Sequence, residues 1–169
     1  MEVDLGSIAK GYAADEVVKI LKQEGIRSAI IDLGGNIYAL GSKNSDNNWK
    51  VGIQDPFSDR GKVIGAVEVF DKTVVTSGIY ERFIEEDGVR YHHILNPKTG
   101  YSYENGLSSV TIISKKSIQG DALSTVCFSL GKEKGLELLN SLEGVSGCFI
   151  DENNQVSYSK AFKHYLNKD

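Results

Sequence analysis

A run of strand-like segments with no helix between them constrains this fold more than any other feature of the sequence. Between residues 49 and 114, stretches rich in β-branched and aromatic residues alternate with short polar turns. Asp87–Gly88, between two of these stretches, is a dipeptide typical of tight β-hairpins. Strands joined so closely pair antiparallel, because parallel neighbours need long crossovers. The segments are WKVGI (49–53), VIGAVEVF (63–70), TVVTSG (73–78), YERFIEE (80–86), VRYHHIL (89–95) and SSVTIIS (108–114).

Helices are expected on both sides of this run. Residues 120–131 predict a helix that begins near Asp121, and residues 132–144 predict another. An earlier amphipathic helix is predicted over residues 8–24, with Ser7 able to cap its start and Gly25 its end. The apolar residues that recur there at helical spacing are Ile8, Tyr12, Ala13, Val17, Ile20 and Leu21.

The remaining segments complete an α+β pattern. SAIIDLGGN (28–36) predicts a buried strand that closes in a tight Gly–Gly bend, and residues 146–159 predict a final hairpin. Helices grouped at the start and near the end predict a mixed, largely antiparallel sheet packed against helices. With 169 residues, the chain is expected to form a single domain over residues 1–169.

Charge and composition argue against several classes of protein. The formal net charge is -4, and no basic cluster is longer than Lys115–Lys116, so nucleic acid is not an expected partner. No apolar run approaches the ~20 residues that span a bilayer, and no signal segment opens the chain, so we expect a soluble protein. Cys127 and Cys148 lie in apolar contexts and are expected to be buried thiols.

Asp121 and Thr125 form the first candidate site. Residues four apart on a helix share one face, so a carboxylate and a hydroxyl would point the same way. Together with main-chain carbonyl and phosphate oxygens, such a pair suits Mg²⁺. The alternative is structural: Asp121 would cap the helix and Thr125 would bond back to its own helix.

The segment DLGSIAKGY (4–12) is a second candidate. Gly6 precedes a helix start, where unpaired N–H groups and the helix dipole attract anions, and Lys10 adds a positive charge. The spacing matches neither the Walker phosphate loop nor the dinucleotide-binding glycine motif. The alternative is a capped helix with an exposed lysine.

YHHILNPKTGY (91–101) holds two of the three histidines in the chain. Alternation along a strand would send His92 and His93 to opposite faces, so one of them at most faces a given site. A histidine beside an acceptor hydroxyl is a natural general base near neutral pH. For an isolated histidine, a structural role is the alternative.

Six segments in order resemble the motif set of the ApbE-type flavin transferases, the FAD:protein FMN transferases once called thiamine biosynthesis lipoproteins. The resemblance runs from residue 2 to about residue 140. It implies an ApbE-like fold and Mg²⁺-dependent transfer of FMN from FAD to a Thr or Ser hydroxyl of a target protein, with release of AMP. The segments are DLGSIAKGYAAD, IDLGGNIYALG, WKVGIQDP, VVTSGIYERF, YHHILNPKTGY and GDALSTVCFSLG.

The resemblance also implies roles for individual residues. Metal ligands would be Asp121, Thr125 and the main-chain carbonyl of Ser7, and His93 would be the general base. His92 would face away from the site. FAD would contact Asp4, Lys10 and the backbone at Leu95, while the loops GGN (34–36) and TSG (76–78), including Thr76 and Gly78, would line the same cleft.

The chain departs from the family pattern chiefly in length, because full members carry a large N-terminal portion that contributes to the FAD cleft. Gly120, Asn96 and Ser7 also replace residues that are more usual there, without removing a ligand side chain. Two other functions therefore stay open. One is an FAD pyrophosphatase that uses water as acceptor. The other is a non-catalytic flavin- or protein-binding module, which could form a homo-oligomer. Full-length members are often exported, membrane-anchored lipoproteins.

Overall fold

A six-stranded sheet forms the centre of the computed structural model, which describes residues 3–44 and 47–166. Its strand order is β1-β2-β5-β8-β9-β10, and each neighbouring pair is antiparallel. The α+β prediction is therefore confirmed. The six strands are β1 (Ala29–Asp32), β2 (Asn36–Leu40), β5 (Lys72–Gly78), β8 (Leu107–Ser114), β9 (Ser146–Asp151) and β10 (Val156–Tyr158).

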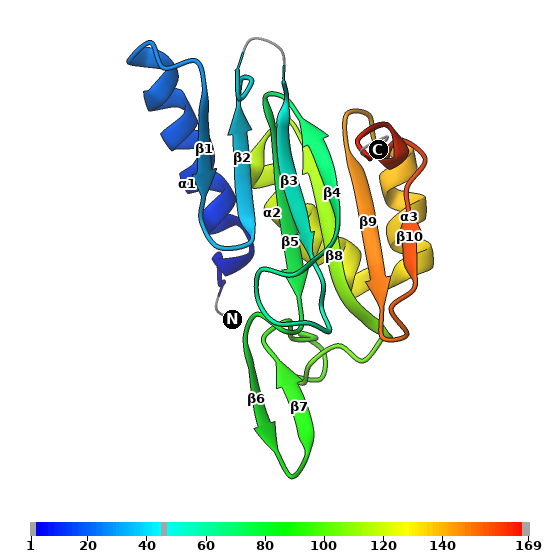
Figure 1. Cartoon of the computed structure of the whole chain (residues 1–169). Helices are drawn as coiled ribbons and strands as arrows, with labels where there is room; N and C mark the ends of the chain where they lie inside the picture. The colour runs from blue at the N-terminus through cyan, green and yellow to red at the C-terminus, as the bar shows by residue number, and fades with distance from the viewer. Residues whose placement is uncertain (1–2, 45–46, 167–169) are drawn as a thin grey trace.

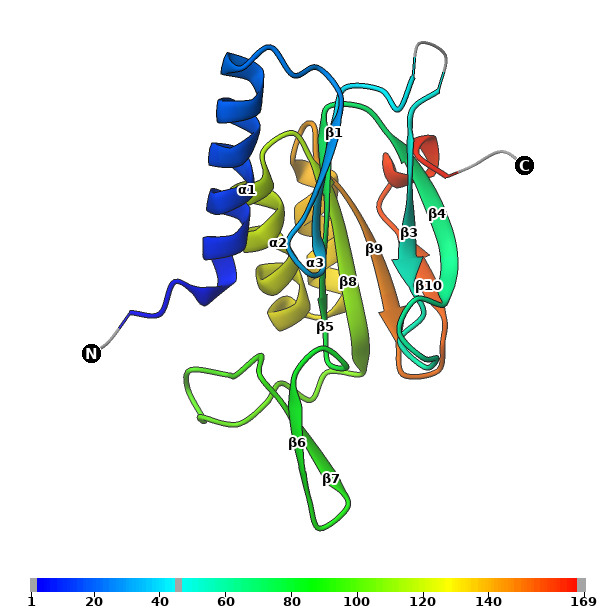
Figure 2. The same cartoon turned by 60° about the vertical axis from the view of Figure 1, so that its left-hand side comes forward.

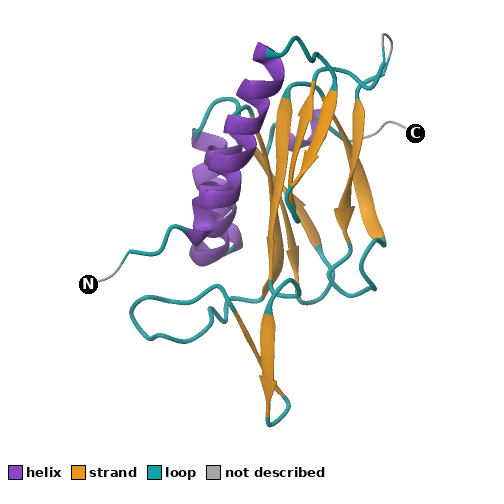
Figure 3. Cartoon of the chain, turned by 90° about the vertical axis from the view of Figure 1, so that its left-hand side faces the viewer, coloured by secondary structure: helices purple, strands orange, loops and turns teal. Residues whose placement is uncertain are grey.

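Two further layers cover this sheet (Figures 1 and 2). Helices α1 (Gly6–Gln23), α2 (Ser117–Leu130) and α3 (Lys132–Ser141) lie on one face. The hairpin of β3 (Trp49–Gln54) and β4 (Val63–Val69) lies on the other, as Figure 3 shows from the side. Within the described residues, no helix combines the length and apolar character needed to cross a membrane.

Apolar side chains fill the space on both faces of the sheet. Every residue of β8 is buried, as expected for a strand at the centre of three layers. Val110 and Ile112 pack with Phe128 of α2 and Phe149 of β9, while Ile113 packs on the opposite side with the β3–β4 hairpin. Cys127 and Cys148 are both buried, and burial raises the pKa of each thiol to about 12, so their prediction as buried thiols is confirmed.

The hairpin of β6 (Phe83–Glu86) and β7 (Val89–His92) projects from one end of the molecule (Figure 1). Asp87 and Gly88 both have positive φ angles, 50° and 75°, which is the two-residue turn that the dipeptide predicts. Both strands are shorter than expected, because residues 80–82 form the turn that leads into β6 and β7 ends at His92.

The start of α2 differs from the prediction. The helix begins at Ser117, so Asp121 lies inside it and is not its cap. The N–H groups of Ser117 and Ile118 donate instead to the two carboxylate oxygens of Asp15 on α1, at 2.8 and 3.0 Å. Strand β2 was also not predicted, although the Gly–Gly bend before it is present, with φ angles of 67° and 77° at Gly34 and Gly35.

Helix α1 is present, but the side of the helix that faces the sheet is not the one that the spacing of its apolar residues predicts. Gly11, Ala14 and Val18 are the buried residues, and Ala14 and Val18 pack against β1 and β2. Tyr12 and Ile20, which the spacing placed on the apolar face, are 58% and 55% exposed.

Candidate active site

Helices α1 and α2 approach each other closely at Gly11. A Cβ atom on Gly11 would lie 2.5 Å from the main-chain oxygen of Ser117, so only glycine allows this contact. The Gly11 N–H donates to Oδ2 of Asp121 at 2.7 Å. The first turns of α1 and a carboxylate of α2 therefore meet at this point.

Asp121 is an acidic side chain held in a buried position, 5% exposed. Burial raises the pKa of its carboxyl above the ordinary value, and the Gly11 N–H, the Lys10 charge and the Asn36 side chain only partly oppose this effect. A buried carboxylate with one hydrogen bond of good geometry retains free oxygen lone pairs. Such a group favours a cation as neighbour.

Ser7 lies one helical turn before Gly11. In an α-helix the N–H of a residue faces the carbonyl four positions earlier, so the Ser7 carbonyl lies beside the same Gly11 N–H that contacts Asp121. The side chain of Ser7 is exposed. Ser7 and Gly11 therefore lie on the same side of α1, one turn apart.

Thr125 lies one turn after Asp121 on α2, beside the end of β5. Its hydroxyl lies 3.5 Å from the hydroxyl of Ser77, which in turn lies 2.8 Å from the hydroxyl of Ser124. Thr76 points to the opposite face of the sheet, where its hydroxyl bonds that of Thr111 at 2.9 Å. The Thr76 main chain still lies near the Gly–Gly bend, because its N–H donates to the Gly35 carbonyl at 2.7 Å.

Lys10 and the β1–β2 bend form the next part of the site. The Lys10 ammonium donates to the Gly34 carbonyl at 2.9 Å. The Asp4 carboxylate accepts from the N–H of Gly6 at the exposed start of α1. Gly78, at the end of β5, is covered by the Tyr80 ring, and a Cβ there would lie 2.5 Å from the ring.

Asn36 is the last residue of the predicted GGN loop, and the structure adds contacts that the sequence does not reveal. It is fully buried, and its side-chain oxygen accepts from the Ser117 hydroxyl at 2.7 Å. Its amide nitrogen has no hydrogen-bond partner of good geometry among the described residues, yet it lies close enough to Asp121 to lower that carboxyl's pKa. The only sequence signal is its position after the glycine pair.

His92 and His93 point to different environments, as expected, but His93 lies just beyond the end of β7, so strand alternation alone does not account for this. His92 is buried against Phe128; its Nδ1 accepts from the Ile94 N–H at 3.3 Å, and its Nε2 lies 2.9 Å from the Tyr103 carbonyl. Nε2 therefore carries the proton, and burial lowers the pKa of this histidine. His92 is a structural residue.

His93 is exposed and has a different hydrogen-bond pattern. Its Nδ1 lies 3.1 Å from the Arg82 carbonyl, which can only accept, so Nδ1 carries the proton in the neutral ring. Nε2 is then an acceptor that faces away from this bond. Within the described residues, no hydrogen bond or ion pair joins His93 or Leu95 to Asp121 or Thr125.

The turn after His93 has a defined structure. The side-chain oxygen of Asn96 accepts from the Lys98 N–H, and the main-chain carbonyl of Asn96 accepts from the Gly100 N–H. Leu95 pairs with Ser102 across the base of this turn, and its side chain is 55% exposed. The turn therefore presents Leu95 at the surface.

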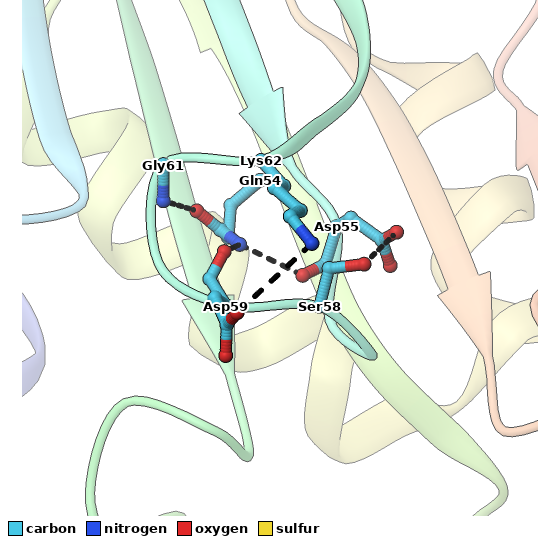
Figure 4. Close-up of polar contacts among 6 residues, drawn as sticks. All are labelled: Gln54, Asp55, Ser58, Asp59, Gly61 and Lys62. Carbon is cyan, nitrogen blue, oxygen red and sulfur yellow. Dashed lines mark hydrogen bonds and ion pairs between the residues drawn. The ribbon is translucent and has the colours of Figure 1, made fainter.

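The QDP segment has a structural role in the loop after β3 (Figure 4). The Gln54 amide donates to the carbonyls of Asp55 and Asp59, and its oxygen accepts from the Gly61 N–H at 2.8 Å. Asp55 accepts from the Phe57 N–H and the Ser58 hydroxyl, and these bonds hold its pKa below the ordinary value. The Gln54 side chain thus holds the loop of residues 55–61 in place through hydrogen bonds to its main chain.

The described residues contain no group of three or more His, Cys, Asp or Glu side chains that could hold a metal ion. A cation at Asp121 would therefore need hydroxyl and main-chain oxygens as its other ligands. Thr125 and the Ser7 carbonyl are groups of that kind, and oxygen ligands with only one carboxylate are typical of Mg²⁺.

Comparison with known proteins identifies the family of the chain. A model described as the ApbE family matches residues 1–149. An FAD:protein FMN transferase of Klebsiella pneumoniae (strain 342) is 45% identical over 159 residues, covering 94% of this chain and 48% of the relative. One from Treponema pallidum (strain Nichols) is 47% identical over 167 residues, covering 94% of this chain and 46% of the relative.

Solved structures give the same result. The ApbE protein of Thermotoga maritima superposes with a TM-score of 0.90 at 36% identity, over 99% of this chain and 54% of that one. The flavinyl transferase ApbE of Pseudomonas stutzeri has a TM-score of 0.80 at 34% identity, over 99% and 52%. The chain spans about half the length of these relatives. Because the family model, the identities and the superpositions agree, the chain belongs to the ApbE family.

Proposed function

We propose that this chain supplies the site for transfer of FMN from FAD to a Thr or Ser hydroxyl of an acceptor protein, with release of AMP. The observation that supports this most is the contact between the Gly11 N–H and the buried Asp121 carboxylate. This contact places oxygen ligands that suit a cation beside the start of α1. The start of that helix in turn suits an anion such as a phosphate. The names of the relatives supply the substrate class.

Mg²⁺ fits the donor set at this point. Asp121, the Thr125 hydroxyl and the Ser7 carbonyl would hold it, and substrate oxygens and water would complete its shell. Bound there, it would stabilise the negative charge that develops on the phosphoryl oxygens. The raised pKa of Asp121 supports this proposal, because a neighbouring cation would offset the unfavourable burial of its charge.

His93 is the proposed general base. The acceptor hydroxyl oxygen forms a bond to the phosphorus of the FMN half, the anhydride bond breaks, and AMP leaves with the bridging oxygen. Nε2 of His93 takes the hydroxyl proton, while Nδ1 stays bonded to the Arg82 carbonyl, which fixes the ring orientation. His92 has no acceptor nitrogen available for this, because both its ring nitrogens are engaged.

The proposed FAD contacts come from segments around the same end of the molecule. Lys10 would place its charge near the phosphates, Asp4 would contact the nucleotide from the start of α1, and exposed Leu95 would lie against the flavin. Thr76 would contribute through its main chain, since its side chain points to the other face of the sheet. Gly78 would act by allowing Tyr80 to pack at the end of β5.

One assay separates the candidate functions. The chain is incubated with FAD, Mg²⁺ and a threonine-containing acceptor protein, and both AMP and fluorescent flavin–protein adduct are measured. Adduct formation that EDTA abolishes supports transfer. AMP release without adduct, independent of acceptor, would indicate a pyrophosphatase. FAD binding with neither product would indicate a binding module, and the transfer proposal would be wrong for this chain.

A further inference from the structure

We propose that Asn36 is a positioning residue of the candidate metal site, where its side-chain amide orients the Asp121 carboxylate toward the cation. Asn36 supplies no ligand itself and acts through Asp121. The inference rests on the proposed Mg²⁺ site and adds to it a residue from a different layer of the fold, because Asn36 begins β2 in the sheet and Asp121 lies on α2.

A chain of buried polar groups holds the oxygen end of the Asn36 side chain. The Ser117 hydroxyl donates to Oδ1 of Asn36 at 2.7 Å, and its oxygen lies 3.1 Å from the hydroxyl of Thr73. Thr73 in turn donates to the Ile37 carbonyl at 2.9 Å. Asn36, Thr73 and Ser117 are all 0% exposed. Because Oδ1 is fixed on Ser117, the amide nitrogen points away from it.

The nitrogen end of the Asn36 side chain lies near Asp121. Ser117 and Asp121 are four residues apart on α2, so their side chains share one face and Asn36 lies beside both. The Asn36 side chain lowers the pKa of the Asp121 carboxyl, as a nearby N–H donor does. Within residues 3–44 and 47–166 this nitrogen has no hydrogen-bond partner of good geometry, which is rare for a buried donor. The Asp121 carboxylate is the acceptor on its side.

Two N–H donors from different elements fix the orientation of a carboxylate. Oδ2 of Asp121 accepts from the Gly11 N–H of α1 at 2.7 Å. The Asn36 amide holds the same carboxylate from β2 and leaves its other lone pairs for a cation. A flipped amide would bring its oxygen against the carboxylate, so Asp121 favours the orientation that the structure shows. Groups that orient a metal-ligating carboxylate in this way are worth ~10- to 100-fold in metal affinity.

The bend before Asn36 connects this contact to the other charged group of the site. The Gly34 carbonyl accepts from the Lys10 ammonium at 2.9 Å, and the Gly35 carbonyl accepts from the Thr76 N–H at 2.7 Å. A single bend therefore holds Lys10, the proposed phosphate contact, and places Asn36 beside Asp121, the proposed metal ligand. The spacing between these two charges is thus set by the start of β2.

Binding of Mn²⁺ alone tests the inference, because Mn²⁺ takes the same oxygen ligands as Mg²⁺ and free Mn²⁺ is measured by electron paramagnetic resonance. Asn36→Leu keeps a side chain branched at Cγ and removes the amide. It should bind Mn²⁺ ~10- to 100-fold more weakly than the wild type. The matched control is Thr73→Val, which removes a buried hydroxyl from the same chain of hydrogen bonds and retains Asn36. This control should bind Mn²⁺ like the wild type.

Nuclear magnetic resonance of the metal-free chain tests the contact itself. The side-chain N–H signals of Asn36, identified by their absence in Asn36→Leu, should shift in Asp121→Ala. They should stay in place in the control Asp151→Asn, which changes a carboxylate at the end of β9. Signals that do not respond to Asp121→Ala would overturn the inference.

The Mn²⁺ titrations can also overturn it, by equal affinity of Asn36→Leu and wild type or by equal losses in Asn36→Leu and Thr73→Val. A wild-type chain that binds no Mn²⁺ would overturn the metal site and this inference with it. Neither measurement uses FAD or an acceptor protein, so its result is separate from that of the transfer assay. Mn²⁺ binding that depends on Asn36, in a chain that transfers no FMN, would support the inference and refute the proposed transfer.

Discussion

At the scale of single residues, the buried carboxylate of Asp121 lowers the stability of the fold when it is ionised. Burial raises its folded-state pKa above the unfolded value, so the folded chain favours the protonated form. Ionisation therefore destabilises the fold at pH values above the folded pKa, and this penalty disappears as the pH falls toward the unfolded value. Sites of this kind are typical of functional positions.

We expect Asp121→Asn to raise the melting temperature at pH 7, since asparagine retains an oxygen for the Gly11 N–H and has no charge. The gain should shrink as the pH falls and vanish below about pH 3, where Asp121 is protonated in both states. The control Asp32→Asn, at an exposed position that accepts from the Gly34 N–H, should change little. A lower melting temperature for Asp121→Asn at neutral pH would contradict this account of the carboxylate.

His92 predicts a pH dependence of the opposite sign. Its pKa is lowered by burial, so the unfolded chain binds the proton more readily than the folded chain. Stability should be complete above about pH 6.5 and should decline as the pH falls below it. In His92→Gln this decline should be smaller, whereas exposed His164→Gln should keep the wild-type profile. Melting temperatures measured between about pH 8 and pH 5 would reveal this difference between the variants. Identical profiles for His92→Gln and wild type would rule out protonation of His92 as the cause of the decline.

At the scale of elements, the contact between α1 and α2 is specified by two residues one helical turn apart. Gly11 permits close approach, and Asp15 caps α2 from a position 102 residues earlier in the chain. No local pattern around residue 117 reveals such a cap, which is why the sequence places the start of α2 near Asp121. Tertiary contacts determined this boundary.

Asp15→Ala should lower the free energy of unfolding by about 1–2 kcal/mol, because two N–H groups at the start of α2 lose their charged acceptor. Glu16→Ala is the matched control on the next position. It removes only an exposed ion pair with Lys19, so we expect a change below about 0.5 kcal/mol. Urea denaturation of both variants gives the comparison, and equal losses would exclude a capping role for Asp15.

Gly11→Ala should destabilise the chain by about 1–3 kcal/mol despite the better helix propensity of alanine, because the new methyl group would meet main-chain atoms of α2. It should also weaken Mg²⁺-dependent FAD binding by displacing Asp121 from α1. Gly65→Ala, where a Cβ meets nothing within 4 Å, should be neutral or stabilising. If Gly11→Ala proved as stable as Gly65→Ala, the close approach would have no energetic importance.

At the scale of the whole molecule, the sequence predicts what depends on local pattern and misses what depends on distant contacts. The strands and the Asp87–Gly88 hairpin follow from alternation and turn chemistry. His92 and His93 have different environments, as expected, although His93 lies beyond the end of β7. The side of α1 that contacts the sheet cannot be predicted in this way, because apolar residues lie on two sides of the helix. Asn36 and Ser77 belong to the GGN and TSG segments that the resemblance places along the cleft, but their contacts with Ser117 and Ser124 arise only when the sheet and α2 come together.

The proposed flavin transfer with His93 as general base is tested by comparing wild type and His93→Ala in the presence of FAD, Mg²⁺ and an acceptor protein. Wild type should form the flavin adduct. The variant should bind FAD with nearly unchanged affinity while adduct formation falls by ~10²- to 10⁴-fold. Unchanged adduct formation by His93→Ala, or FAD binding lost together with transfer, would contradict the role proposed for His93.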